Sequence, residues 1–248
     1  HRYGRRQRQM CIRDRDGKDA ILKIKTDCTF ENDIGIEEII VNRLHKLNLT
    51  PRILHADTQK KVVIYEKVIG SDLSTVPKAN IISKCAKQLK KLHNSNIVCD
   101  DCSSFKSKIK KYEHAIAQKT SNLFYRSAFM FIYKLAARDK HQVFCHNDLN
   151  LSNIMYSDDI FFIDWDYAGF NHPYFDLALL FNAMNLTSNE EYNFLSIYAD
   201  QENNIDHDLL KEYKKMSLYV EYLWIVATSS QENPKYATRF DELTTLLR

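Results

Sequence analysis

The sequence of 248 residues contains no run of apolar side chains long enough to cross a bilayer as a helix, which takes about 20 residues. Its first residues also lack the charged, apolar and small-residue order of a secretory signal peptide. These absences predict a cytoplasmic protein that does not insert into membranes. No internal repeat or low-complexity linker divides the chain, which can form one substantial core or two lobes that share a cleft.

The cysteines lack the spacing of a metal site. Cys99 and Cys102 form a C-x-x-C, but no second Cys or His pair follows at the spacing of a zinc finger. Without a secretory signal, we expect reduced thiols at all 6 cysteines. Cys145 lies in a short apolar run, where a small core residue is the expected role and a nucleophile is not.

Outside residues 1–15, the chain carries no excess of positive charge. The formal charge is +3, but residues 1–15 hold six Arg and one Asp, a net of +5, which leaves −2 for the rest of the chain. Nucleic-acid binding therefore has no support outside that segment. Residues 1–15 show no apolar periodicity, so we expect a non-native or disordered tail and leave it out of the predicted fold.

A dense set of acidic and amide side chains is present between residues 143 and 178. Three short β-rich runs (143–145, 153–156 and 160–163) alternate with a polar loop and a turn at 157–159. Such a hairpin returns the chain on itself, so Asp164 is expected to lie near Asp148 and Asn153. Carboxylate and amide oxygens are ligands suited to Mg²⁺.

The order of these residues is that of a phosphoryl-transfer loop. In H-x-D-x-x-x-x-N, the Asp orients an attacking hydroxyl and accepts its proton, and the Asn holds a metal. A second Asp after the hairpin bridges the metal to the phosphates. His146, Asp148, Asn153 and Asp164 fit this order. The pattern alone could equally be a polar loop between core strands, but an Asp directly after an apolar strand favours the site.

The form HNDLNxxN followed by IDWDYAGxNxxxFDLA resembles the choline/ethanolamine kinase family. That family includes bacterial LicA-type and thiamine-kinase-like members and lies within the aminoglycoside phosphotransferase group. The resemblance implies an α+β, two-lobed protein-kinase-like fold with an N-lobe at 16–69 and a C-lobe at 70–248. It also implies ATP and Mg²⁺ as cofactors, and as substrate a small amino alcohol such as choline, ethanolamine or thiamine.

The predicted N-lobe contains a strand at 20–25 and a helix at 34–47. By the resemblance, Lys23 on the strand and Glu37 on the helix pair to hold the α- and β-phosphates, and Lys25 and Glu38 are the competing neighbours. The alternative is an exposed strand lysine and a solvated helix glutamate. A further strand at 62–65 leads to a connector, the hinge of the resembled fold. Its main chain near Glu66 and Val68 would bond the adenine edge.

The substrate side is predicted from aromatic and polar residues that match the family. Tyr167 stands where the family places a substrate-side Tyr, and Trp224 resembles one Trp of a paired-Trp helix; aromatic faces hold cationic alcohols by cation–π attraction. Asp166 and Asn150 are candidate polar contacts. Core packing is an equally good interpretation of Trp224 and of Tyr222, because aromatic residues at helical spacing are common in cores.

Three departures from the family narrow these expectations. Ala227 replaces the partner Trp, and Ala183 stands where the family has a carboxylate, so choline is in doubt and ethanolamine, thiamine or another amino alcohol is open. Only Gly4 and Gly17 precede Lys23, whereas the family has a glycine-containing hairpin there that covers the phosphates. We therefore expect an incomplete N-lobe and a weaker enzyme.

Asp176 begins a predicted buried helix, where its carboxylate is expected to cap backbone N–H groups and brace the catalytic loop. Two other functions stay open. An aminoglycoside-type antibiotic kinase would share the loop but take a different alcohol. A nucleotide-binding pseudokinase module is favoured by the missing glycine hairpin and disfavoured by the complete set of Asp148, Asn153 and Asp164.

Overall fold

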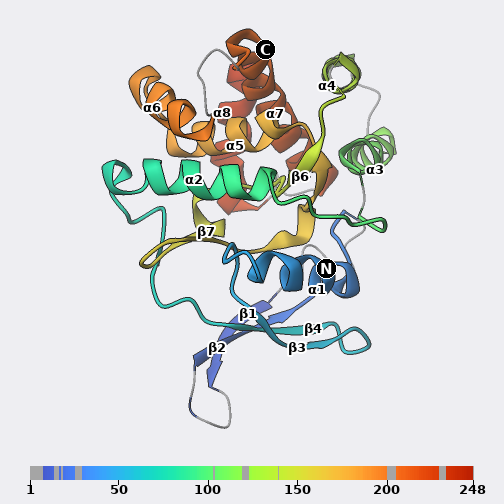
Figure 1. Cartoon of the computed structure of the whole chain (residues 1–248). Coiled ribbons are helices and arrows are strands. Elements are labelled where there is room, and N and C mark those ends of the chain that lie inside the picture. Colours follow the sequence, from blue (N-terminus) through green and yellow to red (C-terminus); the bar gives the residue numbers. More distant parts are fainter. Residues whose placement is uncertain are drawn as a thin grey trace.

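A computed structural model describes residues 8–13, 17, 19–25, 30–102, 104–118, 123–138, 140–199, 205–228 and 233–247. The described residues form two lobes: a small antiparallel sheet with helix α1 (Ile34–His45), and a second lobe made mostly of helices (Figure 1). The α+β, two-lobed prediction is confirmed. Within the described ranges, no helix is both long enough and apolar enough to cross a membrane.

The N-terminal sheet holds β2 in its interior. Its strand order is β1-β2-β4-β3. Because β2 is paired on both edges, the backbone that carries Lys23 is fixed. Asp33 caps α1 by accepting the N–H of Ile36 at 2.9 Å, and the helix buries Ile40 and Leu44. The strands are β1 (Arg8–Arg13), β2 (Asp19–Ile24), β3 (Ile53–Asp57) and β4 (Val62–Glu66).

Strand β1 corrects the prediction for part of the 1–15 tail. Arg8–Arg13 pairs antiparallel with β2, from Arg8 opposite Ile24 to Arg13 opposite Asp19. The pairing runs through backbone hydrogen bonds at a sheet edge, where most side chains face solvent, so the apolar alternation that marks a strand is not required. Residues 1–7 and 14–16 lie outside the described residues. Gly17, in the β1–β2 connection, has φ of +79°.

The second lobe stacks helices on a short-stranded catalytic segment. β5 (Ser71–Asp72), β7 (Ile154–Tyr156) and β8 (Ile160–Phe162) form one sheet, and β6 (Val143–Cys145) pairs with β9 (Gly169–Asn171). Two 3₁₀ turns, η2 (Leu151–Asn153) and η3 (Trp165–Tyr167), interrupt this segment. The helices are α2 (Ile82–His93), α3 (Phe105–Ala117), α4 (Leu123–Arg138), α5 (Pro173–Met184), α6 (Ser188–Tyr198), α7 (His207–Ala227) and α8 (Pro234–Leu247).

The cysteine prediction is wrong for one pair. Cys99 and Cys102 are joined by a disulfide in the turn that follows α2, with a Cα–Cα distance of 5.3 Å. Two Cα atoms three residues apart come this close in a turn of the chain, which the absence of a secretory signal neither predicts nor excludes. Among the described residues, Cys11, Cys85 and Cys145 are free thiols.

Candidate active site

The catalytic loop, residues 146–153, presents Asp148 and Asn153 together. The Asn153 amide donates hydrogen bonds to the Asp148 carbonyl oxygen and to Asp148 Oδ2, both at 2.9 Å. These bonds use the amide nitrogen and leave the amide oxygen able to act as an acceptor. Asp164 follows β8 with φ of +66°, a strained conformation for a non-glycine residue of the kind that concentrates at functional sites.

Asp176 of α5 holds the backbone of the catalytic loop in place. Its two carboxylate oxygens accept the backbone N–H groups of His146 and Asn147, each at 2.8 Å. The predicted bracing role of Asp176 is thereby confirmed, whereas the N-terminus of α5 is capped by His172, whose Nδ1 accepts the N–H of Tyr174 at 3.1 Å. Two bonds to one carboxylate fix the loop backbone, which positions Asp148.

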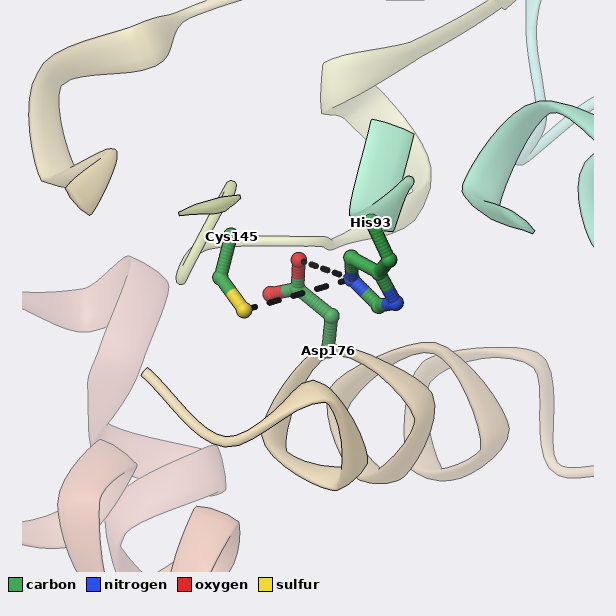
Figure 2. Close-up of side chains that lie close together, drawn as sticks. All are labelled: His93, Cys145 and Asp176. Carbon is green, nitrogen blue, oxygen red and sulfur yellow. Dashed lines mark hydrogen bonds and ion pairs between the residues drawn. The ribbon is translucent and has the colours of Figure 1, made fainter. Parts of the chain in front are cut away.

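Figure 2 shows that Asp176 also lies beside His93 and Cys145, in an arrangement that resembles a Cys-His-Asp nucleophilic site. The distances are 3.2 Å from His93 Nε2 to Asp176 Oδ2 and 3.9 Å from His93 Nε2 to Cys145 Sγ. Burial raises the pKa of the Cys145 thiol well above its usual value. Because a nucleophile or metal ligand must be a thiolate, Cys145 is a core residue, as the sequence predicts.

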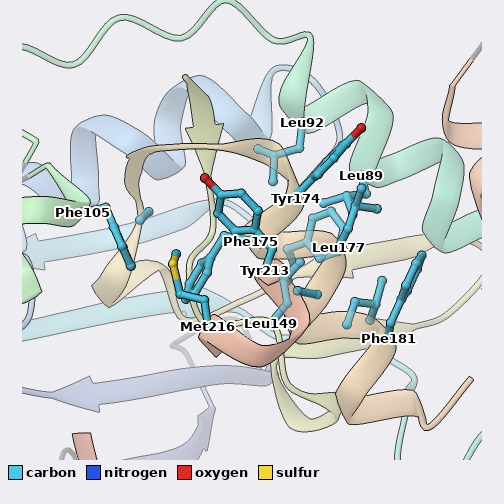
Figure 3. Packing of buried hydrophobic residues seen from close by; sticks show 14 of the residues in the cluster. Leu89, Leu92, Phe105, Leu149, Tyr174, Phe175, Leu177, Phe181, Tyr213 and Met216 are labelled. Atoms are coloured by element: carbon cyan, nitrogen blue, oxygen red, sulfur yellow. The ribbon is translucent and has the colours of Figure 1, made fainter. Parts of the chain in front are cut away.

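The catalytic loop is also anchored through Leu149, which is buried directly after Asp148. Figure 3 shows Leu149 among the packed side chains of the helical lobe, with Leu177 and Phe175 of α5 and with Tyr213 and Met216 of α7. A well-packed core leaves little room for such a side chain to shift. Core packing and the Asp176 bonds therefore hold the two ends of the same short segment.

One ammonium group joins the two lobes at the site. Lys23 Nζ lies 2.9 Å from Glu37 Oε1, 2.8 Å from Asp164 Oδ1 and 2.9 Å from Asp166 Oδ1. The side chains of Lys23 and Glu37 are 2% and 0% exposed, which excludes the alternative of a solvated pair. The competing residue Lys25 joins the same cluster: it pairs with Glu37 and lies 2.6 Å from Asp166 Oδ1.

The buried cluster raises the pKa of Lys23 and lowers that of Asp166. Burial alone would lower the pKa of Lys23, but the carboxylates of Glu37, Asp164 and Asp166 raise it well above its usual value. Burial would raise the pKa of Asp166, but Lys23 and Lys25 lower it, so this carboxylate stays charged. Asp166, 2% exposed, is thus engaged by both lysines, and its predicted contact with substrate stays a prediction.

The donor set of Asp148, Asn153 and Asp164 fits a divalent cation. Burial, together with the nearby Asp164 charge, raises the pKa of Asp148 to about 8. Burial and the Asp166 charge raise the pKa of Asp164, although Lys23 opposes the shift. The raised pKa values show that both carboxyl groups disfavour their negative charge, which a bound cation would stabilise, and the role of Asn153 and Asp164 as Mg²⁺ ligands stays a prediction.

A pocket lies between the sheet and the β7–β8 hairpin, and both Lys23 and Asp164 line it. Its cavity volume is ≈ 200 Å³. The connector residues predicted to bond adenine, Glu66 and Val68, both line it. Apolar side chains from both lobes complete the lining, namely Ile21, Pro51, Met155 and Ile163.

The predicted substrate-side residues make different contacts within the protein. Trp224 Nε1 donates to the Tyr167 hydroxyl at 2.9 Å, so these two half-buried rings lie together, and their contact with substrate stays a prediction. Asn150 instead accepts the N–H of Ser152 at 3.0 Å and caps η2. Tyr222 is buried and stacks on Phe240 with ring centroids 5.0 Å apart, which supports its core-packing interpretation.

Three residues of the site were missed by the sequence analysis. Asn32 donates to the carbonyl oxygens of Trp165 and Ala168, at 3.2 and 2.9 Å, and Asn147 donates to those of Tyr167 and Gly169, both at 3.1 Å. Lys108 of α3 donates to Ala168 O at 3.1 Å. All three hold the segment after Asp164 by its main-chain oxygens, which leave no pattern in the sequence.

Comparison with known proteins gives consistent results. A family profile described as "Phosphotransferase enzyme family" (APH) matches residues 3–213. A LicA homolog of Mycoplasma capricolum is 26% identical over 227 residues, covering 90% of this chain and 87% of that protein. The crystal structure of choline kinase LicA from Streptococcus pneumoniae superposes with a TM-score of 0.82 at 25% identity, covering 96% and 89%. A LicA complex with AMP gives 0.75 at 25% identity, covering 93% and 84%.

Proposed function

Because this chain belongs to the phosphotransferase enzyme family, and within it to the choline/ethanolamine kinases, we propose that it moves the γ-phosphoryl group of ATP onto the hydroxyl of a small amino alcohol. The chain is a phosphotransferase that acts on an alcohol. The nucleotide, the metal and the choice among choline, ethanolamine and thiamine are the parts proposed, together with a cytoplasmic location.

Each proposed role follows from the position of a side chain. Asp148 orients the acceptor hydroxyl and takes its proton as the oxygen bonds to the γ-phosphorus, and the bond from that phosphorus to the β-phosphate oxygen breaks to release ADP. Asn153 and Asp164 would hold Mg²⁺, which neutralises phosphate charge when bound. Lys23, fixed by Glu37, would contact the phosphates, and the main chain near Glu66 and Val68 would bind adenine.

The observation that carries the proposal is the set of contacts made by Lys23. One buried ammonium joins residues 14 and 141 positions away in sequence, Glu37 of α1 and Asp164 after β8. In protein kinases, a strand lysine paired with a helix glutamate and a metal-binding acid after the catalytic hairpin must both be in place for phosphoryl transfer. Positioning and charge neutralisation would then supply most of the rate enhancement.

The test is a panel of alcohols incubated with ATP and Mg²⁺ while ADP release is followed. We expect turnover with choline, ethanolamine or thiamine, and a loss of about 100- to 10,000-fold in kcat for Asp148→Asn. The exposed variant Asp208→Asn serves as a control and should keep the parent rate. Turnover of aminoglycosides alone would move the chain to the antibiotic kinases, and a fully active Asp148→Asn would remove Asp148 from its role.

A further inference from the structure

Lys108 is a buried cation that the proposed mechanism does not use. Its side chain is 4% exposed, and its ammonium donates to a single main-chain oxygen, Ala168 O. Within the described part of the chain, no carboxylate lies at ion-pairing distance from it. An ammonium has three donors, and burying one without an anionic partner is costly, so a group of this kind is a candidate for a functional role.

Lys108 faces the ring that the resemblance assigns to the substrate. Its Nζ lies 5.8 Å from the centroid of the Tyr167 ring, over the face. The other end of that ring is fixed, because the Tyr167 hydroxyl accepts the indole N–H of Trp224. The rings of Tyr236 and Trp224 pack in a T-shaped arrangement, with centroids 5.6 Å apart. The protein therefore places its own cation on the aromatic face of a rigid Tyr–Trp pair.

The consequence for a cationic substrate depends on what its ammonium can bind. A quaternary ammonium has no N–H group, so aromatic faces are its main specific partners in a protein. A primary ammonium can instead donate hydrogen bonds to carboxylates and carbonyl oxygens. A second positive charge at Tyr167 would be repelled by Lys108, and at a separation of about 10–12 Å and an effective dielectric constant of about 20 this repulsion weakens binding on the order of tenfold.

We propose that Lys108 sets the charge preference of the acceptor site: it occupies the face of Tyr167 that a quaternary ammonium would need, and so favours primary amino alcohols over choline. The inference rests on the proposed function and names its substrate class. Lys108 acts here through charge and position, and it takes no part in bond making or breaking.

The experiment compares three acceptors of related shape. Choline and 3,3-dimethylbutan-1-ol differ by one charge at almost constant volume, and ethanolamine carries a primary amine. Steady-state kcat/KM is measured at pH 6, below the Lys108 pKa of about 7. The proteins compared are the parent, Lys108→Gln, which keeps an N–H donor for Ala168 O, and Lys108→Met, which does not. Lys110→Gln, on the exposed side of α3, is the matched control. Thermal unfolding checks that each variant is folded.

We expect the parent to prefer ethanolamine over choline. Both Lys108 variants should raise kcat/KM for choline about tenfold while changing that for the neutral isostere less than about twofold. Equal gains for choline and the isostere would mean that only space was created, and an unchanged choline-to-isostere ratio would mean that the charge has no effect; either overturns the role of Lys108. If no alcohol is phosphorylated by parent or variants, the proposed function fails and the inference falls with it.

Discussion

At the scale of single residues, the site depends on buried charges that satisfy one another. Lys23 and Lys25 share Glu37 and Asp166, and Lys25 Nζ also donates to Asn32 O at 2.8 Å. Removing one member of a buried ion pair leaves its partner uncompensated and is strongly destabilising. The same contacts fix Glu37 and Asp166, so stability and the geometry of the proposed phosphate site depend on the same atoms.

Lys25→Met should therefore lower the free energy of unfolding by about 3–5 kcal/mol, measured by urea denaturation. The control is Lys60→Met, since Lys60 is 81% exposed in its ion pair with Asp57 and such pairs contribute little. A Lys25→Met protein as stable as the parent would show that this lysine is not needed to hold the two carboxylates.

The proposed role of Lys108 predicts that the preference between charged and neutral acceptor alcohols depends on pH. Burial lowers its pKa to about 7, with Lys111 and Lys25 adding to the shift and Asp166 and Asp148 opposing it. Lys108 is therefore mostly charged at pH 6 and mostly neutral at pH 8.5. The ratio of kcat/KM for choline to that for its neutral isostere should rise between pH 6 and pH 8.5 in the parent and stay flat in Lys108→Gln. A ratio that rises equally in both would assign the titration to another group.

At the scale of elements, the backbone of the connector at Gly70 packs closely against the backbone of the β7–β8 hairpin at Tyr156. A Cβ built on Gly70 would sit 2.1 Å from the main-chain oxygen of Tyr156, so no other residue fits without a backbone shift. Gly70 also lines the pocket beside Lys23, the proposed nucleotide site. The pairing of β5 with β7 and the shape of the pocket therefore depend on the same glycine.

Gly70→Ala should lower the free energy of unfolding by about 1–3 kcal/mol, as overpacking does, and raise the KM for nucleotide. Gly35→Ala is the contrasting variant, because a Cβ there would meet only Asp33 Oδ1, at 3.4 Å, and alanine favours a helix. It should be neutral or slightly stabilising in thermal unfolding. Equal effects of the two substitutions would contradict the close approach at Gly70.

At the scale of the whole molecule, polar contacts join the two lobes next to the pocket. Besides Lys23–Asp164, the N–H of Asn32 donates to Asp166 O at 2.7 Å, and Trp165 Nε1 donates to Thr50 Oγ1 at 3.0 Å. Because the site is built from both lobes, a ligand bound there stabilises their docked arrangement as well as its own contacts.

ATP with Mg²⁺ should therefore raise the melting temperature by more than ATP with EDTA does, since a ligand that binds only the folded state stabilises it by mass action. Asp164→Asn should lose the difference between the two conditions while keeping a shift from nucleotide alone. Differential scanning fluorimetry measures all four combinations. If the variant keeps the full Mg²⁺-dependent increment, Asp164 is not a metal ligand.

The sequence by itself determined the order of the catalytic segment. Spacing and local pattern placed β6, the polar loop and β8, and the structure joins Asp148 to Asn153 across that loop, because a short hairpin leaves its residues few alternatives. Periodicity likewise placed α1 to within a few residues of its ends. The metal and nucleotide roles assigned on that basis stay predictions.

Only the tertiary structure decided which charges meet. Lys25 joins Asp166, Lys108 reaches Ala168, and β1 pairs with β2 through main-chain bonds at an edge, and none of these contacts leaves a local pattern. The disulfide between Cys99 and Cys102 likewise depends on a turn. Local sequence fixes which groups are available, whereas burial and long-range packing fix their partners, their pKa values and therefore the chemistry that the site can support.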